Sequence, residues 1–225
     1  MLQWKRCIWI YVALLSCLGV LRLRNAIPLP FSKKITVATQ GGGDFRAIQE
    51  AIDQGVPEYN RQWVYIYLYT CIYIGSDLCN TVLFSLVTCR ENVLIHKPYI
   101  YMEGQTGVRI ASSYSNNIAS ATFTVAAENF VARNIIFQNT YNRELPIAKN
   151  PRSPAVAAIV KGEKTPFYGC GFLRVQDTLW DASGRHLFRN CYIEVDFIVG
   201  NGQSVYEVSK LIFRHYLSSN VHTHK

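Results

Sequence analysis

The residues best suited to chemistry are Gln176, Asp177 and Asp196. Gln176 and Asp177 stand in the block Val175-Gln-Asp-Thr-Leu179, and Asp196 opens the block Asp196-Phe-Ile-Val-Gly200. Two carboxylates can divide the work of a hydrolysis, because the ionised one can attack while the protonated one donates a proton. A single aspartate beside a short strand is more often a turn former, so the residue types alone leave both interpretations open.

Metal chemistry is not indicated by the sequence. No Cys-x-x-Cys pair occurs, and the histidines at positions 96, 186, 215, 222 and 224 do not cluster near cysteines with the spacing of metal ligands. We interpret His186, in Gly184-Arg-His186, as a structural or surface residue rather than a catalytic one. We therefore expect neither a metal nor a cofactor.

The N-terminus has the layout of a secretory signal. Lys5 and Arg6 precede an apolar run from Cys7 to Leu21 that is shorter than a bilayer span. We predict that residues 1–26 are a signal peptide, with a retained signal anchor as the alternative. Either one directs the rest of the chain out of the cytosol, and the seven cysteines fit an oxidising compartment.

The composition indicates one globular domain. The chain has 225 residues, of which 49% are hydrophobic and only 17% charged, so disorder is excluded. A net charge of +8 suits a polyanionic partner, although a basic surface that only aids solubility is equally compatible. No RNA-binding signature, zinc-finger spacing or basic heptad helix occurs, so we do not expect nucleic acid.

A short repeat predicts stacked coils. The block Phe167-Tyr-Gly-Cys170-Gly-Phe172 recurs as Phe188-Arg-Asn-Cys191-Tyr-Ile193, and the aromatic, cysteine and apolar positions superpose. A period of about 20 residues favours a β-solenoid, with a β-sandwich as the competing fold. Equivalent residues of neighbouring coils would lie about 4.8 Å apart, so we predict a disulfide between Cys170 and Cys191.

Several further blocks resemble the plant pectinesterases (pectin methylesterases), and they follow one another in that family's order. The blocks are Ile35-Thr-Val-Ala-Thr-Gln-Gly-Gly-Gly-Asp-Phe, Lys97-Pro-Tyr-Ile-Tyr-Met-Glu-Gly104, Asn134-Ile-Ile-Phe-Gln-Asn-Thr140, Pro154-Ala-Val-Ala-Ala158, Gln176-Asp-Thr-Leu179, Gly184-Arg-His186 and Asp196-Phe-Ile-Val-Gly200. The resemblance covers residues 33–210. It implies an all-β fold, a right-handed parallel β-helix with a short N-terminal helical cap, truncated at its C-terminus.

The resemblance also implies an activity and its residues. The activity is removal of methyl esters from cell-wall homogalacturonan, with Asp196 as the nucleophile and Asp177 as the acid and then the base. Gln176 would donate a hydrogen bond to the oxyanion. Trp180 and Phe197 would bind the sugar, although core packing is an equal alternative for Trp180. Expected partners are pectin and a proteinaceous pectinesterase inhibitor, with no stable membrane partner.

Two departures from the family concern the catalytic residues themselves. Pro154 stands where the family has a second oxyanion-donating glutamine, and losing one such donor costs on the order of 10²–10³ in rate. The spacing from Cys170 to Asp177 is seven residues, but that from Cys191 to Asp196 is only five. Two residues of strand span about 6.6 Å, so we expect Asp196 to be displaced unless a turn absorbs the difference.

Two further departures concern whole segments. Residues 69–89 form an apolar, cysteine-containing insertion, which we interpret as a gene-model error or retained intron, with a membrane helix as the alternative. Residues 211–225 resemble nothing in the family, and the downstream arginine and tryptophan of its active site have no counterpart here. A catalytically inactive, pectinesterase-derived polysaccharide-binding protein or a truncated product is therefore the alternative function.

Overall fold

Strands that alternate buried and half-exposed side chains build the fold. In β2 (Val64–Leu68), Val64, Ile66 and Leu68 are buried, while Tyr65 and Tyr67 between them are half-exposed. Side chains of a strand point to opposite faces in turn, so such a strand must lie against a core on one side. The computed structural model describes residues 30–69, 88–113, 121–141, 156–173, 178–195, 198–207 and 209–213.

The described strands form three parallel sheets within one compact unit, Phe31–Lys225. The seven-stranded sheet contains β1 (Lys33–Val37), β2, β5 (Ile100–Gly104), β8 (Phe130–Arg133), β11 (Thr165–Tyr168), β14 (Arg185–Arg189) and β17 (Gln203–Glu207). The six-stranded sheet contains β3 (Thr88–Arg90), β6 (Arg109–Ser112), β9 (Ile136–Asn139), β12 (Gly171–Leu173), β15 (Tyr192–Val195) and β18 (Lys210–Phe213). The five-stranded sheet contains β4 (Val93–Ile95), β7 (Phe123–Val125), β10 (Ala158–Val160), β13 (Leu179–Asp181) and β16 (Ile198–Val199).

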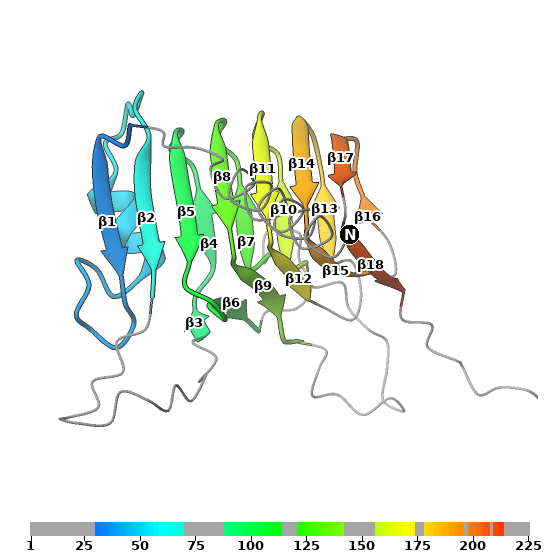
Figure 1. Cartoon of the computed structure of the whole chain (residues 1–225), viewed down its shortest axis with the longest axis horizontal. Coiled ribbons are helices and arrows are strands. Elements are labelled where there is room, and N and C mark those ends of the chain that lie inside the picture. The colour runs from blue at the N-terminus through cyan, green and yellow to red at the C-terminus, as the bar shows by residue number, and fades with distance from the viewer. Residues whose placement is uncertain are drawn as a thin grey trace, which may run out of the picture. The chain divides into compact units, whose positions relative to one another are not determined.

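From β3 onward, each coil passes through the six-, five- and seven-stranded sheets in turn, so equivalent strands stack side by side (Figure 1). This is a parallel β-helix, as the resemblance implies. The predicted repeat is confirmed by the strand pairing, which sets Phe167 against Phe188 and Gly171 against Tyr192.

Aromatic rings of neighbouring coils stack in the core. The rings of Phe167 and Phe188 are parallel with centroids 5.0 Å apart, and Tyr206 continues the column 4.7 Å from Phe188. Fully burying one such side chain contributes about 1.5–3 kcal/mol. The column therefore fixes the stacking distance and much of the stability at this end of the described coils.

Single left-handed residues make one of the corners. Asn134, Gly169 and Asn190 have φ of 54°, 60° and 55°, and each separates a strand of the seven-stranded sheet from one of the six-stranded sheet. Their backbone N–H groups donate to the coil that follows; Asn190, for example, donates to Glu207 O at 3.0 Å. Glycine and asparagine are the residues that adopt this conformation readily.

One short helical segment covers the start of the core, as the resemblance implies. It consists of α2 (Ile48–Glu50) and η1 (Ala51–Gly55), a single π-helical turn. The Glu91 carboxylate accepts hydrogen bonds from the N–H groups of Ile48 and Gln49 at 2.9–3.0 Å. At the other end, buried Lys97 donates to the carbonyl oxygens of Asp53 and Val56 at 2.8 and 2.9 Å. Side chains of the first coils thus satisfy both helix ends.

Two segment boundaries differ from those predicted. Thr88 and Cys89 close the predicted insertion 69–89, but they belong to β3, and Cys89 is buried in the core. Leu211 opens the predicted unmatched tail, but it belongs to β18 and pairs with Ile193. The signal segment 1–26 and most of the insertion lie outside the described residues. Among the helices that the structure does describe, none is long and apolar enough to cross a membrane.

Candidate active site

The corner between the six-stranded and five-stranded sheets carries a group of buried polar side chains; we call it the polar corner. Ser112 and Thr122 share a hydrogen bond of 2.6 Å between their hydroxyl oxygens. Thr122 Oγ1 also donates to Gln138 O at 3.2 Å, and Asn139 Nδ2 donates to Val156 O at 3.3 Å. The first and third of these bonds cross the corner within one coil, and the second joins neighbouring coils.

The predicted catalytic residues belong to two links across this corner. Gln176 and Asp177 stand between β12 and β13 in the chain, and Asp196 and Phe197 stand between β15 and β16. All four lie outside the described residues, as does Pro154. The strands on both sides of each link are described, and they define where each link begins and ends.

The pairing of those strands bears on the shortened spacing before Asp196. Gly171 pairs with Tyr192 in the six-stranded sheet, and Leu179 pairs with Ile198 in the five-stranded sheet. The partners of the second pair are two positions closer in the sequence than those of the first. The two missing residues therefore fall in the link itself, and the strands beyond it remain paired. In the five-stranded sheet Leu179 and Ile198 are partners. Asp177 stands two residues before Leu179, and Asp196 stands two residues before Ile198.

Backbone hydrogen bonds hold the residue that follows Asp177. Thr178 is buried, and its carbonyl oxygen accepts from the N–H groups of Ala157 and Ala158 at 3.1 and 3.3 Å. Leu179 then pairs with Ala158 in the preceding coil. The start of β13 is thus fixed to β10, and this limits where the Asp177 link can end.

Trp180 lies on the outer face of the five-stranded sheet. It is half-buried and packs beside a small apolar cluster of Ala121, Val156 and Ile159. Its strand neighbours Leu179 and Asp181 are buried, as the alternation of a strand requires. Trp180 thus packs against this cluster and leaves part of its ring accessible, and both interpretations offered for it, core packing and sugar stacking, stay predictions.

A polar cavity of about 1050 Å³ lies along the same corner, in the earlier coils. Arg109 crosses its lining, where Nη1 donates to Gln138 Oε1 at 2.7 Å. Its lining residues come from β3, β6, β9 and the segments after them: Thr88, Arg90, Glu91, Asn92, Arg109, Ala111, Ser112, Ser113, Gln138 and Thr140. Two arginines among hydroxyl and amide groups suit a hydroxyl-rich ligand that carries negative charge.

A buried charged cluster at the end of β13 was missed by the sequence analysis. The Asp181 carboxylate lies 2.5 Å from His186 Nδ1 through Oδ1, and it accepts from the Tyr206 hydroxyl at 3.0 Å through Oδ2. His186 is buried, so its interpretation as a structural residue agrees with its position. One signal was available: Asp181 stands two residues after buried Leu179, at an inward-facing position of a strand.

The surroundings of Asp181 change its acidity. Burial alone would raise the pKa of this carboxyl, but hydrogen bonds from His186, Ser204 and Tyr206 outweigh it. The pKa of Asp181 is therefore lower than its ordinary value, and the group is ionised at neutral pH. Burial and the neighbouring carboxylate together raise the pKa of Tyr206, so its hydroxyl remains a donor.

Cys170 and Cys191 are both free and buried, so the predicted disulfide is not formed in this structure. The coil stacking that prompted the prediction is present, since the residues that follow the two cysteines pair with each other. The Cys191 thiol instead donates to Phe167 O at 3.5 Å, and the Cys170 thiol lies 3.6 Å from Tyr168 O. Within the described ranges, no three His, Cys, Asp or Glu side chains form a group that could hold a metal ion.

The comparison with known proteins agrees with this architecture. A family model described as Pectinesterase matches residues 34–223. The chain belongs to the pectinesterase family. The match to this family extends beyond Leu211, so the segment expected to lie outside the resemblance is largely inside it.

Named pectinesterases of Arabidopsis thaliana are similar to this chain over most of its length. "Probable pectinesterase 29" is 37% identical over 211 residues, covering 89% of this chain and 58% of the relative. "Probable pectinesterase 55" is 38% identical over 205 residues, covering 87% of this chain and 56% of the relative. The chain thus spans somewhat more than half the length of these pectinesterases.

Solved structures of pectinesterases share the fold. The pectin methylesterase from carrot is 30% identical with a TM-score of 0.63, over 79% of this chain and 51% of that one. PemA from Erwinia chrysanthemi is 21% identical with a TM-score of 0.65, over 83% and 56%. A pectin methylesterase solved in complex with a hexasaccharide has a TM-score of 0.68 at 20% identity, over 85% and 58%. The last two likenesses show the parallel β-helix alone.

Proposed function

We propose that this pectinesterase-family chain is a secreted carboxylic ester hydrolase that removes methyl groups from cell-wall homogalacturonan. One observation carries the proposal. Asp177 and Asp196 have the same offset, two residues, from the paired positions Leu179 and Ile198. The strand register therefore supports two carboxylates at equivalent positions of neighbouring coils. Stacked coils are about 4.8 Å apart, which suits a cooperating pair.

The proposed reaction has two steps. The ionised Asp196 carboxylate attacks the ester carbonyl carbon, the carbon–oxygen bond to methanol breaks, and Asp177 gives its proton to the departing methoxy oxygen. Asp177, now ionised, removes a proton from water, which attacks the acyl group and releases Asp196. Gln176 donates an amide N–H to the oxyanion in both steps. A nearby ionised carboxylate raises the pKa of its neighbour, so Asp177 would start protonated.

The polar cavity supports a polysaccharide substrate with carboxyl groups. Arg90 and Arg109 could pair with free carboxylates of galacturonate units, while the hydroxyl and amide groups of its lining could bind sugar hydroxyls. The cavity follows the same corner as the two catalytic links, in earlier coils. A chain bound in it could therefore continue toward Asp177 and Asp196. Trp180 and Phe197 remain the proposed sugar-stacking residues.

The experiment measures methanol release from highly esterified pectin by the purified, secreted chain. Asp177→Asn and Asp196→Asn should each reduce the rate by at least about 10³-fold, because each removes a group that bonds to or transfers a proton with the reacting atoms. Asp53→Asn changes an exposed aspartate beside His96 and serves as the matched control. A fully active Asp196→Asn variant would refute the mechanism.

A second function is favoured by Pro154, which cannot supply the oxyanion hydrogen bond of the family's glutamine. In this alternative the chain binds pectin without hydrolysing it. Binding to pectate by a folded sample that releases no methanol would assign the second function. A proteinaceous pectinesterase inhibitor remains a proposed partner, which the family resemblance supports, and co-purification from cell-wall extract would test it.

A further inference from the structure

Asp181 occupies a position where the other coils have aliphatic core residues. It pairs with Val160, which pairs with Val125 in the coil before, and both valines are fully buried. An ionised carboxylate in such a place is costly unless other groups hydrogen-bond to it. Asp181 therefore needs hydrogen-bond partners that offset the free-energy cost of burying its charge, and it can make contacts that valine cannot.

The partners of Asp181 come from the two following strands of the seven-stranded sheet. His186 in β14 lies against one carboxylate oxygen, and its other ring nitrogen lies 2.9 Å from Gly162 O. Nδ1 thus faces the Asp181 carboxylate and Nε2 faces a backbone carbonyl oxygen, so His186 links Asp181 to the chain at Gly162. Tyr206 in β17 donates to the second carboxylate oxygen. The cluster therefore ties the coil of β13 to the coil that follows it.

The turn after β16 rests directly on this carboxylate. Gly202 N donates to Asp181 O at 3.0 Å, and Asn201 N donates to Ala182 O at 3.2 Å. A methyl group added to Gly202 would lie 2.0 Å from Asp181 Oδ1, and one added to Gly200 would lie 1.8 Å from Asp181 O. Only a bare backbone approaches so closely. The turn 200–202 is thus seated against both the backbone and the side chain of Asp181.

We propose that Asp181, His186 and Tyr206 are positioning residues for the two catalytic aspartates, an inference that rests on the proposed function. The cluster holds the turn 200–202 against β13, and β16, which leads into this turn, begins only two residues after Asp196. β13 itself begins two residues after Asp177. By joining the ends of these two strands, the cluster keeps the links that carry Asp177 and Asp196 in register. The three residues act through the backbone and touch no substrate.

The most direct test is Tyr206→Phe, compared with Tyr65→Phe. Both changes remove a phenol hydroxyl that donates to a carboxylate at 3.0 Å. The acceptor is Asp181 for Tyr206 and Glu103 for Tyr65. The ring stacking of Tyr206 on Phe188 is retained, so the variant should fold. Methanol release gives kcat and KM, and hydrogen exchange read by mass spectrometry reports on the amides of 198–203.

We expect Tyr206→Phe to lower kcat about tenfold with KM unchanged, and to speed exchange across 198–203, because a misplacement of about 1 Å can cost on the order of 10²-fold. Asp181→Asn should have the larger effect, and Tyr65→Phe should change neither quantity. Unchanged exchange across 198–203 in both Tyr206→Phe and Asp181→Asn overturns the inference. Faster exchange with an unchanged kcat also overturns it, because the cluster would then only stabilise the fold.

The proposed function can fail separately. If the unmodified chain releases no methanol, the hydrolase proposal falls, and the exchange comparison alone decides whether the cluster fixes the turn. Faster exchange in Tyr206→Phe but not in Tyr65→Phe then supports the positional role, and equal exchange in the two variants refutes it.

Discussion

Cys170 and Cys191 show how burial changes the chemistry of a thiol. Burial raises the pKa of the Cys191 thiol to about 11, and it raises that of Cys170 well above its ordinary value, with a further contribution from Cys191. The thiolate is the reactive form, so at pH 8 very little of either residue can be alkylated. The two residues are equivalent in neighbouring coils, and this arrangement permits either a pair of inert thiols or an oxidised pair.

Alkylation at pH 8 followed by peptide mass spectrometry separates these states. The structure predicts that iodoacetamide leaves Cys170 and Cys191 unmodified in the native protein and labels both in urea without reductant. Labelling in urea only after a reductant is added would instead show that the purified protein contains the disulfide. Rapid labelling of the native protein would contradict the burial of both side chains.

Asp181 gives the stability of the protein a defined pH dependence. The native pKa is lower than the unfolded value of about 3.9, so the ionised carboxylate stabilises the native state fully above that value. This contribution is lost as the pH falls through the lower native pKa. The free energy of unfolding of the unmodified protein should therefore exceed that of Asp181→Asn most at pH 5–6, and by less near pH 3. Urea unfolding at these pH values measures the gap; a gap that does not depend on pH would contradict the assignment.

At the scale of elements, the left-handed corner residues determine where strands end. The two repeated blocks, 167–172 and 188–193, each read as one unbroken run in the sequence, but the structure divides each into parts of two strands, at Gly169 and at Asn190. The repeat could be found in the sequence because equivalent core positions carry the same kinds of side chain. The corner could not, because one residue of positive φ leaves no gap in an apolar pattern.

Asn190 offers a test of these corners. Asn190→Ala should lower the free energy of unfolding by about 1–2 kcal/mol, because alanine is strained at a φ of 55°. Asn190→Gly should lower it much less, since glycine adopts this conformation freely. Thermal or urea unfolding measures the loss of stability in both variants. The control is the same pair of changes at Asn201, which is exposed and has no positive φ. Equal losses for alanine and glycine would show that the contacts of the asparagine side chain, rather than its backbone conformation, stabilise the corner.

The candidate site shows the same limit of sequence reasoning at a larger scale. The order of the motifs was sufficient to predict the family and the β-helix. The displacement expected for Asp196 came from counting residues after Cys191, on the six-stranded side of the link. Strand pairing on the five-stranded side shows that the strands beyond the shortened link stay paired, so the difference in length falls within the link. The position of Asp196 itself lies outside the described residues. Whether a turn can shorten depends on the three-dimensional pairing of strands on both sides, which no single sequence reveals.

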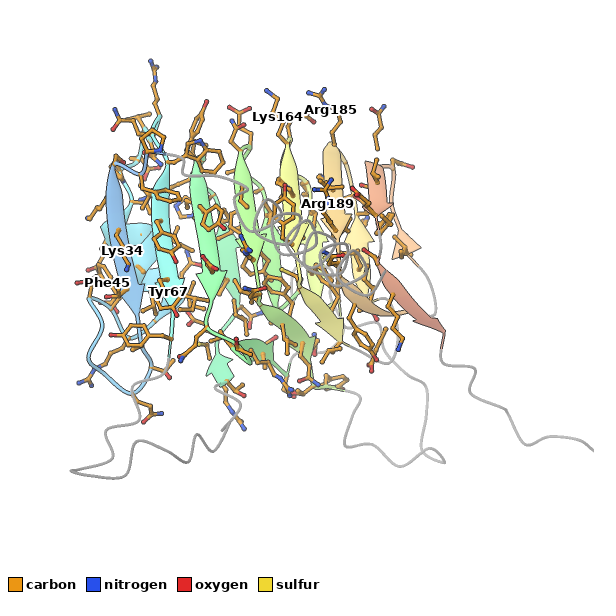
Figure 2. All side chains as sticks on the ribbon, in the orientation of Figure 1. Lys34, Phe45, Tyr67, Lys164, Arg185 and Arg189 are labelled. Carbon is orange, nitrogen blue, oxygen red and sulfur yellow. The ribbon has the colours of Figure 1, made fainter. Side chains whose placement is uncertain are left out.

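At the scale of the whole molecule, the net charge of +8 favours association with polyanions. The basic side chains are distributed over more than one surface. Lys164 and Arg185 point outward where β11 and β14 begin (Figure 2), whereas Arg90 and Arg109 line the polar cavity. General attraction and specific binding can therefore be separated by changing one arginine at each location.

Arg109→Gln should weaken binding to pectate by roughly tenfold or more, because a hydrogen bond to a charged group contributes about 1.5–3 kcal/mol. Arg185→Gln removes the same charge from an exposed side chain that pairs with Glu163. It should change the affinity for pectate only slightly, through the lower net charge. Affinities measured by calorimetry at low and moderate salt give the comparison. If the two variants lose the same affinity at every salt concentration, only net charge matters, and the cavity is not the binding site.

The capping of the helical segment has a consequence for the order of events during synthesis. Residues 48–55 leave the ribosome well before Glu91 and Lys97, whose side chains satisfy the two helix ends. Until those residues emerge, the N–H groups of Ile48 and Gln49 and the carbonyl oxygens of Asp53 and Val56 lack the protein partners that they have in the finished fold. The nascent start of the β-helix is therefore incomplete by itself and becomes stable only when the next coil closes over it.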